Sequence, residues 1–553
     1  MVALICCWAL IAAFSAPLGH SLLCAAYGDR DNRLGDWLVQ ALWLGLIACE
    51  WLAAAVSLIA PVTPSNLGVV VGVSCAVALA ANSRTSAGWA LGARLRQLIR
   101  LDAALTLAVI VTFSAFVAAN LRSTPDTGGY HIPAIRWLAE YGLVTGVAHI
   151  QIRFGFISSV WAMVAPFDTV FDGRADGVVN GFVLCMVSGQ IVIALGRVAR
   201  GVSRPSDIFL AVASAGLLAI GLVIGSFSTP SPDPSLAALT CVIAWRLLAS
   251  VEAKSTDRSM VPLLLACGAL NAKLSGLLLV PIAGLYVVLG SGMRRWIGAG
   301  VVTAVLVAPF FVASVMASGC LALPAAITCL PVPWALPIES VKELGAAATL
   351  FSRWDSQVPP NPGAWNWIPG WLMGTRLWLN ASVFWPFVAC LAGFLWVTRR
   401  DLNRGEIWVL ALLVPSLVLL FAVAPEIRYN AGLFVIPVAL FAMRLIVPPT
   451  KTFAADAATL VGAAAAVVIV QVTVSGAIEY RRSGHITIAE RLVRPRAIPV
   501  ENYLVVTAPG IRYNMAISGY CWRAPLPCAS TRLGPVILRA PARDLAAGFQ
   551  SAR

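Results

Sequence analysis

Long apolar runs separated by short polar segments recur along almost the whole chain. The runs at 36–60, 101–119 and 207–227, for example, have the length of roughly 20 residues that a helix needs to span a bilayer. Hydrocarbon offers the backbone no other hydrogen-bond partner, so these runs must be helical. A β-barrel would instead show segments of about ten residues with alternating polarity. The pattern predicts an all-α polytopic membrane protein with about 12–14 transmembrane helices.

The expected spans, in chain order, are 2–26, 36–60, 66–81, 101–119, 175–196, 207–227, 235–251, 259–271, 274–290, 296–318, 376–397, 406–424, 430–447 and 457–475. The spans 259–271 and 274–290 are short, and together they could form one broken hairpin. The first span lacks a basic segment before it and a clear cleavage site, so we expect a retained helix.

Composition agrees with this fold class. The 553 residues are 59% hydrophobic and only 12% charged, and the mean hydropathy is +0.84. A net charge of +14 could suggest nucleic-acid binding. In a polytopic protein, however, excess Arg and Lys collects on the cytoplasmic loops and sets the orientation of the helices. We therefore expect the basic residues to report orientation, with no nucleic acid as a partner.

The most basic short segment, 84–100, is assigned to the cytoplasm on this rule. Because successive spans cross the membrane in alternate directions, the loop 29–33 then lies on the same side. This agrees with its two arginines. The apolar stretch 154–167 is too short for a clear span. If it crossed the membrane, Arg197, Arg200 and Arg204 would lie outside, so we expect it to form a short helix in the interface.

Alternation of the spans then divides the chain into three parts. Residues 1–100 form N-terminal transmembrane helices, residues 101–475 form a transmembrane core, and residues 476–553 form a small extracytoplasmic tail. The tail is α/β-like, with strand-like pieces at 503–507 and 535–539. The polar segments expected on the outer side are 120–174, 319–375 and the tail.

Two close cysteine pairs fall on these outer segments, Cys320 with Cys329 and Cys521 with Cys528. An oxidising compartment favours disulfides there. Free thiols remain the alternative, because spacing alone does not establish the geometry of a disulfide. The other cysteines lie in apolar runs, where a thiol usually serves as a packing residue.

The same outer side collects ionisable residues beside the bilayer. Asp126 begins the first outer loop, Asp233 lies between prolines, Lys273 interrupts the expected hairpin, and Glu426 and Arg428 precede a span. Each alone could be a turn residue or a cation that reaches the headgroups. Charges near hydrocarbon usually face a cavity or one another, so their joint placement predicts a site.

Two carboxylates and two cations would suit an anionic lipid phosphate and an acceptor hydroxyl that loses a proton. Aromatic faces for sugar rings are offered by Tyr130, Trp137, Trp365 and Trp367, although Trp is also common at membrane interfaces. His131 is expected to form a hydrogen bond with a neighbour or a substrate.

Other chemistries find less support. His131 and His149 could join Asp126 in holding a divalent metal, but their separation matches no compact ligand motif. A metal is therefore allowed but not favoured, and no other cofactor is expected. The chain has no P-loop, no G-x-G-x-x-G before a helix, no H-E-x-x-H and no G-x-S-x-G.

Four strings, with the general layout from about residue 101 to 447, resemble the GT-C superfamily of integral-membrane glycosyltransferases, which use polyprenyl-phosphate-linked sugars. The strings are Asp126-Thr-Gly-Gly-Tyr-His-Ile-Pro-Ala-Ile-Arg-Trp, Ser231-Pro-Asp233, Ala272-Lys273-Leu-Ser-Gly-Leu and Ala424-Pro-Glu-Ile-Arg428-Tyr. The resemblance implies that Asp126 is the catalytic base. The first outer loop lacks the Asp-Asp or Glu-x-Asp pair of metal-dependent members, and the three spans before residue 101 depart from the simplest layout of that superfamily.

Two further strings look like a bacterial multi-pass group related to GT-C: His149-Ile-Gln-Ile-Arg153-Phe-Gly-Phe-Ile-Ser-Ser and Gly519-Tyr-Cys521-Trp-Arg-Ala-Pro-Leu-Pro-Cys528. This second resemblance adds Arg153 as a site residue and supports the pairing of the tail cysteines.

The resulting hypothesis is transfer of a sugar from a polyprenyl-phosphate donor to an envelope glycan or glycolipid acceptor. The reaction is expected on the outer side of a bacterial inner membrane. Asp126 would be the base and Asp233 would share that catalytic role or shape the acceptor site, while Lys273, Arg153 and Arg428 would hold the lipid phosphate. The alternatives are a transporter or flippase for lipid-linked saccharides, a polymerase or ligase of such saccharides, and a structural scaffold.

Overall fold

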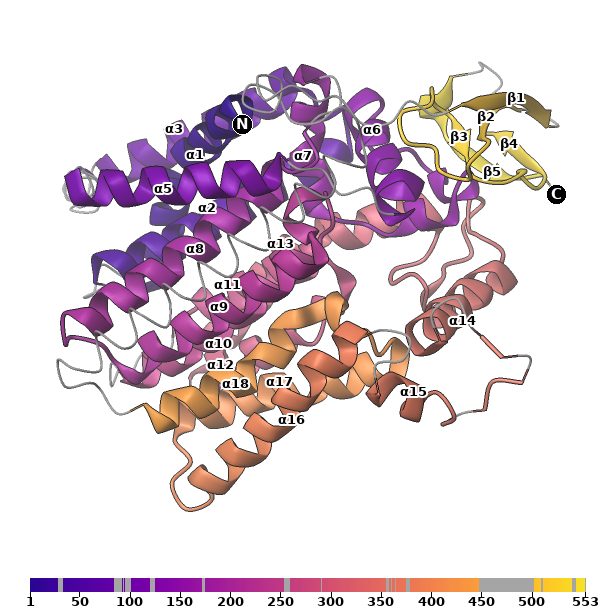
Figure 1. The fold of residues 1–553 in the computed structure, drawn as a ribbon. Helices are drawn as coiled ribbons and strands as arrows, with labels where there is room; N and C mark the ends of the chain where they lie inside the picture. Colours follow the sequence, from indigo (N-terminus) through magenta and orange to yellow (C-terminus); the bar gives the residue numbers. More distant parts are fainter. Residues whose placement is uncertain are drawn as a thin grey trace.

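The structure is a computed structural model. It describes residues 1–27, 33–83, 92, 94, 101–119, 125–171, 175–252, 259–289, 291–354, 358–359, 361–363, 365–373, 378–446, 502–508, 511–539 and 544–552. Long helices run beside one another, and some of the short helices gather with a small β unit at one end of them (Figure 1).

The long helices are α1 (Val2–Tyr27), α2 (Leu34–Ser57), α3 (Pro64–Ser83), α5 (Leu101–Ala118), α8 (Val178–Ala199), α9 (Pro205–Ile224), α10 (Asp233–Glu252), α13 (Met293–Ser318), α16 (Trp378–Thr398), α17 (Arg404–Val423) and α18 (Ala431–Leu445). The shorter helices are α6 (Ile132–Glu140), α7 (Ser159–Val170), α11 (Val261–Ala272), α12 (Leu279–Val288), α14 (Ile338–Trp354) and α15 (Ile368–Leu372).

Ten helices in the described part of the chain are long and apolar enough to cross a membrane, and shorter apolar helices cover 103–118, 261–272 and 274–288. The prediction of an all-α polytopic membrane protein is therefore confirmed. The expected span 457–475 lies outside the described residues.

Helix α10 lies at the centre of the helical part. In the apolar stretch of this helix, 89% of the residues are buried. The helix packs against α9, α11, α17 and α18. A helix that is apolar on every side is expected in such a position, since only full burial satisfies all of its faces. The first residue of this central helix is Asp233, so the packing of α10 fixes where that carboxylate lies.

The expected broken hairpin is present. Helix α11 ends at Ala272, Lys273 has an extended backbone, and the turn η5 (Leu274–Gly276) leads to α12. A Cβ atom at Gly276 would lie 2.8 Å from the backbone of Ala269, so only glycine lets the chain fold back this closely. The break is what brings Lys273 to the end of the helices.

The first outer loop corrects one expectation. Residues 154–167 were expected to form a helix in the bilayer interface. Residues 159–167 do form part of a short helix, α7, but its residues Val160, Val164 and Ala165 are fully buried within the protein. Helix α7 packs against α2 and α6. Its polar residues Ser159 and Asp168 are also paired inside the protein, with Glu50 and Arg523.

The C-terminal β unit contains two small sheets. Strand β1 (Tyr503–Ala508) pairs antiparallel with β2 (Ile511–Ala516), and β2 pairs parallel with β3 (Cys528–Ala529). Strands β4 (Val536–Leu538) and β5 (Phe549–Ser551) form the second sheet. Disulfides join Cys521 to Cys528 and, outside the β unit, Cys320 to Cys329.

All three segments expected on one side of the membrane contact one another. The Phe549 amide of the β unit donates to the Thr145 carbonyl of the first loop at 2.9 Å, and the Gly146 amide donates to the Met316 carbonyl at 2.7 Å. His149 Nε2 lies 3.1 Å from the carbonyl oxygen of Trp334 in the second outer segment. The structure therefore places these segments at the same end of the helices (Figure 1).

The opposite end carries a buried ion-pair network that joins α2, α8 and α9. Arg197 Nη1 lies 2.6 Å from an oxygen of both Asp36 and Asp207. Arg33 makes a two-pronged contact with Asp207, with both N–O distances at 2.9 Å. Arg33 and Arg197 were assigned to the same side from the sequence, and they do share a face.

The burial of this network predicts that losing one of its carboxylates destabilises the protein far more than losing an exposed ion-pair carboxylate. Asp207 is fully buried, so Asp207→Ala leaves two guanidinium groups without their carboxylate and should cost about 3–5 kcal/mol of unfolding free energy. Asp401 pairs with Arg444 but is 85% exposed, so Asp401→Ala should cost about 1 kcal/mol or less. Thermal unfolding in detergent measures both effects. Equal shifts of the unfolding temperature would contradict the assignment of Asp207 to a buried ion-pair network.

Candidate functional site

Six ionisable residues from separate segments meet at the end of the helices that carries the β unit. We call them the charged cluster. Asp126 precedes the π-helical turn η1 (Thr127–His131), and Asp233 begins α10. Arg153 lies in the turn η3 (Ile152–Gly155), and Lys273 lies in the break after α11. Glu426 precedes the turn η7 (Ile427–Asn430), and Arg428 lies within it.

Ion pairs connect the charged cluster. Asp126 Oδ2 lies 3.1 Å from Arg428 Nη1, and Asp126 Oδ1 lies 3.5 Å from Arg153 Nη1. Arg428 Nε also forms an ion pair with Glu426. Lys273 forms a separate ion pair with Asp233. The cluster thus contains three carboxylates and three cations, and each carboxylate is in contact with at least one cation.

Tyr429 connects the two groups of ion pairs. Lys273 Nζ lies 4.3 Å from the centroid of its ring, and the guanidinium carbon of Arg428 lies 5.3 Å from the same centroid. An aromatic ring attracts cations through its electron-rich face. Tyr429 therefore holds both cations near one ring, a role that the sequence did not reveal because the spacing of residues does not show which cations a ring will meet.

Exposure differs across the cluster. The Glu426 and Asp233 side chains are 8% and 14% exposed, whereas Asp126 is 26% and Arg153 49% exposed. Burial raises the pKa of the Glu426 carboxyl, and the adjacent Arg428 opposes that shift. Asp126 is thus the most accessible carboxylate of the cluster.

Two neighbouring helices, α8 and α7, hold the turn before Asp233 in place. The Asn180 amide donates to the carbonyls of Thr229 at 2.5 Å and Ser231 at 2.7 Å. The Trp161 indole of α7 donates to the Pro230 carbonyl at 2.9 Å. These bonds fix the turn before α10, because they satisfy carbonyls that its prolines would otherwise leave without a local donor.

Tyr130 and His131 lie beside the charged cluster. The Arg153 guanidinium carbon lies 5.5 Å from the Tyr130 ring centroid, and the Tyr130 and His131 rings meet edge to face at 4.3 Å. Burial raises the pKa of Tyr130 well above its usual value, and the charges of Asp126 and Asp233 add to the shift. Tyr130 is therefore an uncharged phenol at neutral pH.

His131 is uncharged as well. Burial lowers its pKa to about 4, although Asp126 and Asp233 act in the opposite direction. Its Nδ1 has no hydrogen-bond partner among the described residues. The imidazole packs against Trp161 at a centroid distance of 5.3 Å. A neutral imidazole whose Nδ1 has no partner in the described part of the protein keeps one hydrogen-bonding position unused, and the hydrogen bond expected for His131 stays a prediction.

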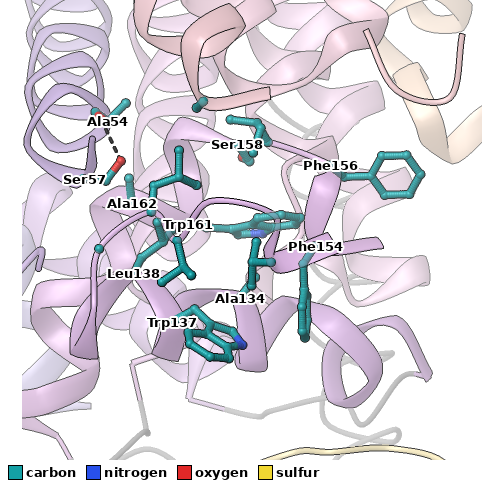
Figure 2. A pocket seen from close by; sticks show the side chains of 16 residues that line it. Ala54, Ser57, Ala134, Trp137, Leu138, Phe154, Phe156, Ser158, Trp161 and Ala162 are labelled. Carbon is teal, nitrogen blue, oxygen red and sulfur yellow. Dashed lines mark hydrogen bonds between the residues drawn. The ribbon is translucent and has the colours of Figure 1, made fainter. Parts of the chain in front are cut away.

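An apolar cavity adjoins Tyr130 and His131. Trp161, which contacts both Tyr130 and His131, also lines the cavity, and Figure 2 shows it across the middle of the view. Trp137 and Phe154 lie on one side of it and Ser158 on the other. The sequence did not single out Trp161, because a tryptophan within an apolar stretch carries no signal of its own.

Three tryptophans expected to bind sugar rings do not lie at the charged cluster. Trp137 is buried against Tyr141 and Phe549. Trp367 packs at right angles on Trp371 and is itself buried, whereas Trp365 is 73% exposed. The structure therefore does not gather these tryptophans at the charged cluster within the described residues. Trp137 lines the apolar cavity beside Trp161, and Trp367 is enclosed by its packing on Trp371.

No three His, Cys, Asp or Glu side chains form a metal-binding group within the described ranges. His149 was considered with His131 and Asp126 as a ligand. It lies instead against the Trp334 carbonyl, and burial lowers its pKa.

The stability of the folded chain should depend on pH through His131. The unfolded chain binds a proton near pH 6.5, whereas folded His131 does so only near pH 4. Acid therefore favours the unfolded chain between these values, by about 2 kcal/mol from pH 7 to pH 5. His131→Phe keeps an aromatic ring but cannot titrate. Between pH 7 and pH 5 its unfolding free energy should therefore fall by about 2 kcal/mol less than that of the unmodified protein.

Thermal unfolding in detergent at pH 7 and pH 5 measures this difference. The two proteins differ only at position 131, so the comparison isolates the histidine. An identical pH dependence of the two proteins would show that His131 is not buried in its neutral form.

Comparison with known proteins gives one match. A family model described as "Domain of unknown function (DUF8201)" matches residues 1–435, a range that contains the whole charged cluster and ends before the β unit. No curated protein and no solved structure matches the chain.

Proposed function

This chain belongs to the DUF8201 family, and we propose that it is an integral-membrane glycosyltransferase of the kind its sequence resembles. It would transfer a sugar from a polyprenyl phosphate to an envelope glycan or glycolipid on the outer side of a bacterial inner membrane. The observation that carries the proposal is the charged cluster, in which six charged side chains from five segments of the chain lie together at one end of the helices. Charges near hydrocarbon are costly and usually mark a functional site.

The proposed reaction needs a base and a stabilised leaving group. The acceptor hydroxyl oxygen attacks the anomeric carbon of the sugar, and the bond from that carbon to the phosphate oxygen breaks. The phosphate leaves with the electron pair, and the hydroxyl proton passes to the Asp126 carboxylate. Cations beside the phosphate stabilise its charge in the transition state.

The ion pairs of the cluster support a role in phosphate binding. Arg428 and Arg153 both contact Asp126, and a phosphate entering the site would compete for the same guanidinium groups. Arginine binds phosphate through two parallel hydrogen bonds, which makes that exchange favourable. Once the guanidiniums bind the phosphate, the Asp126 carboxylate loses their stabilisation and becomes a stronger base.

Asp233 and Lys273 suit a supporting role. Asp233 is less exposed than Asp126 and forms an ion pair with Lys273, and it lies at the N-terminus of α10, where the helix dipole stabilises a negative charge. These features favour a carboxylate that stays ionised and shapes the acceptor site. Lys273 adds a further cation near the leaving phosphate.

A transporter or flippase is less well supported. Such a protein would need ionisable residues along a path through the membrane, whereas the cluster lies at one end of the helices. Arg246 is the buried cation within α10, and it lies close to the opposite end of that helix.

The primary test is Asp126→Asn, which keeps the size of the side chain and removes the base. Transfer of a radiolabelled hexose or pentose from polyprenyl phosphate in membrane vesicles should fall by about 100-fold or more. Asp401→Asn changes an exposed carboxylate at the other end of the helices and should leave transfer unchanged. Full transfer by Asp126→Asn at normal expression would refute the proposed base and would favour a polymerase or ligase that uses only the cations.

A second test concerns the donor phosphate. Arg428→Lys keeps the charge but loses the planar pair of donors, so KM for the polyprenyl-phosphate sugar should rise by about tenfold. The matched control is Arg399→Lys, because Arg399 stacks on Trp396 at 4.3 Å, away from the cluster. An unchanged KM in Arg428→Lys would mean that this guanidinium does not bind the phosphate.

A further inference from the structure

The π-helical turn that follows Asp126 leaves one carbonyl without a donor of its own. In η1 the Ile132 amide donates to the Thr127 carbonyl, five residues earlier. The next donor in this register would belong to Pro133, which has no N–H group. The Gly128 carbonyl therefore needs a partner from elsewhere. The Trp522 amide of the C-terminal β unit supplies it at 2.9 Å.

The Trp522 side chain closes over the same turn. A Cβ atom at Gly128 would lie 2.3 Å from Cε2 of the indole, so the contact requires glycine at that position. Ile132 and Trp522 form a small buried cluster of their own. A Cβ atom at Gly129 would lie 3.7 Å from the Tyr520 ring. Both glycines of the turn thus face the segment 520–522.

Trp522 is held in an uncommon backbone conformation. Its φ is +40°, in the left-handed region that bulky residues seldom adopt. Such a conformation persists only where the surrounding structure imposes it, and such places are often functional. The disulfide from Cys521 to Cys528 closes the segment.

The residues that follow Trp522 tie the same segment to the first outer loop. Arg523 Nη1 lies 2.9 Å from Asp168 Oδ1 in α7, and Arg136 Nη1 of α6 donates to the Ala524 carbonyl at 2.5 Å. Helix α6 follows η1 directly and packs against α7. The segment is therefore anchored independently of the Trp522 contacts, so it can act as a rigid support for the turn.

We propose that Trp522 is a positioning residue of the candidate site, which holds η1 in its π-helical form and so keeps Asp126 and Tyr130 in place. A π-helical turn contains one residue more than an α-helical turn. If η1 relaxed to an α-helix, the residues before it would rotate by about 100° relative to α6. Asp126 would then leave Arg153 and Arg428. The C-terminal β unit is in this sense a part of the site.

The activity part of this inference rests on the proposed function, but the position of η1 can be measured without it. Thr127 is fully buried in η1, so Thr127→Cys should react slowly with a membrane-impermeant maleimide in the full-length protein. Adding Trp522→Ala should increase the labelling rate by about tenfold or more, because the turn loses both its cover and its hydrogen-bond geometry. Ala148→Cys, in the turn η2 (Val147–His149) of the same loop and 2% exposed, is the control position and should stay protected.

Transfer kinetics give the second measurement, in the background that keeps Thr127. Trp522→Ala should lower kcat by about 10- to 100-fold with little change in KM for the donor, as expected for a misplaced base. Trp522→Phe retains a ring over Gly128 and should restore most of kcat. A merely structural role would not produce this division between kcat and KM or the rescue by phenylalanine.

Gly128→Ala provides the matched change on the other side of the contact, and it keeps the test valid if Trp522→Ala does not fold. The added methyl group meets the indole, so it should displace η1 and increase labelling of Thr127→Cys in the same way. Continued protection of Thr127→Cys in both variants would overturn the proposal. So would rapid labelling with an unchanged kcat, because the turn would then be held without serving the site.

The two proposals can fail separately. If Asp126→Asn is fully active, the proposed base is wrong, yet the labelling experiment still shows whether Trp522 holds η1. If Asp126→Asn is inactive and Trp522→Ala neither exposes Thr127→Cys nor lowers kcat, only the role of Trp522 is refuted.

Discussion

The ion pair between Asp126 and Arg428 joins residues 302 positions apart and connects the first outer loop to the segment before α18. Arg428 also contacts Glu426 and lies beside Tyr429, whose ring is shared with Lys273. Each charge lies close to apolar helices, where an unpaired ion is costly. The cluster consequently pairs three carboxylates with three cations, and under the proposed function the donor phosphate would displace a carboxylate from its guanidinium partners. This exchange would couple donor binding to the basicity of Asp126.

The helices are fixed at both ends by different means. One end holds a buried network of Arg33, Arg197, Asp36 and Asp207, which joins three helices through short ion pairs. The other end holds the charged cluster, in which Asp126, Arg153 and Arg428 remain partly accessible. In the first network, Asp36, Arg197 and Asp207 are at most 7% exposed, so their ion pairs orient the helices without access for a ligand. The partly exposed pairs of Asp126 can exchange partners, which is what a binding site requires.

The C-terminal β unit adds a constraint that the helices alone do not provide. In the π-helical register the Gly128 carbonyl would accept from residue 133, which is a proline without an N–H group. The Trp522 amide donates to this carbonyl in its place. Helical packing positions Asp233, Lys273 and Arg428, whereas Asp126 lies directly before the π-helical turn η1 of the first outer loop. Its position accordingly depends on contacts made by a segment nearly 400 residues later in the chain, such as the bond from Arg136 to Ala524 across 388 positions.

The sequence by itself determined the fold class, the break at Lys273, the grouping of three polar segments at one end and the ionisable residues that meet there. These features follow from local patterns, because hydropathy and charge report on the transfer of each segment between lipid and water. Only the tertiary structure decided which charges pair, that α7 is internal, that His131 is buried, and that Trp161 and Tyr429 adjoin the cluster while Trp137, Trp365 and Trp367 do not. Hydropathy gives the depth of a residue but not its direction around a helix or its neighbours across the bundle. Those neighbours are set by the packing of helices and loops that are far apart in the chain.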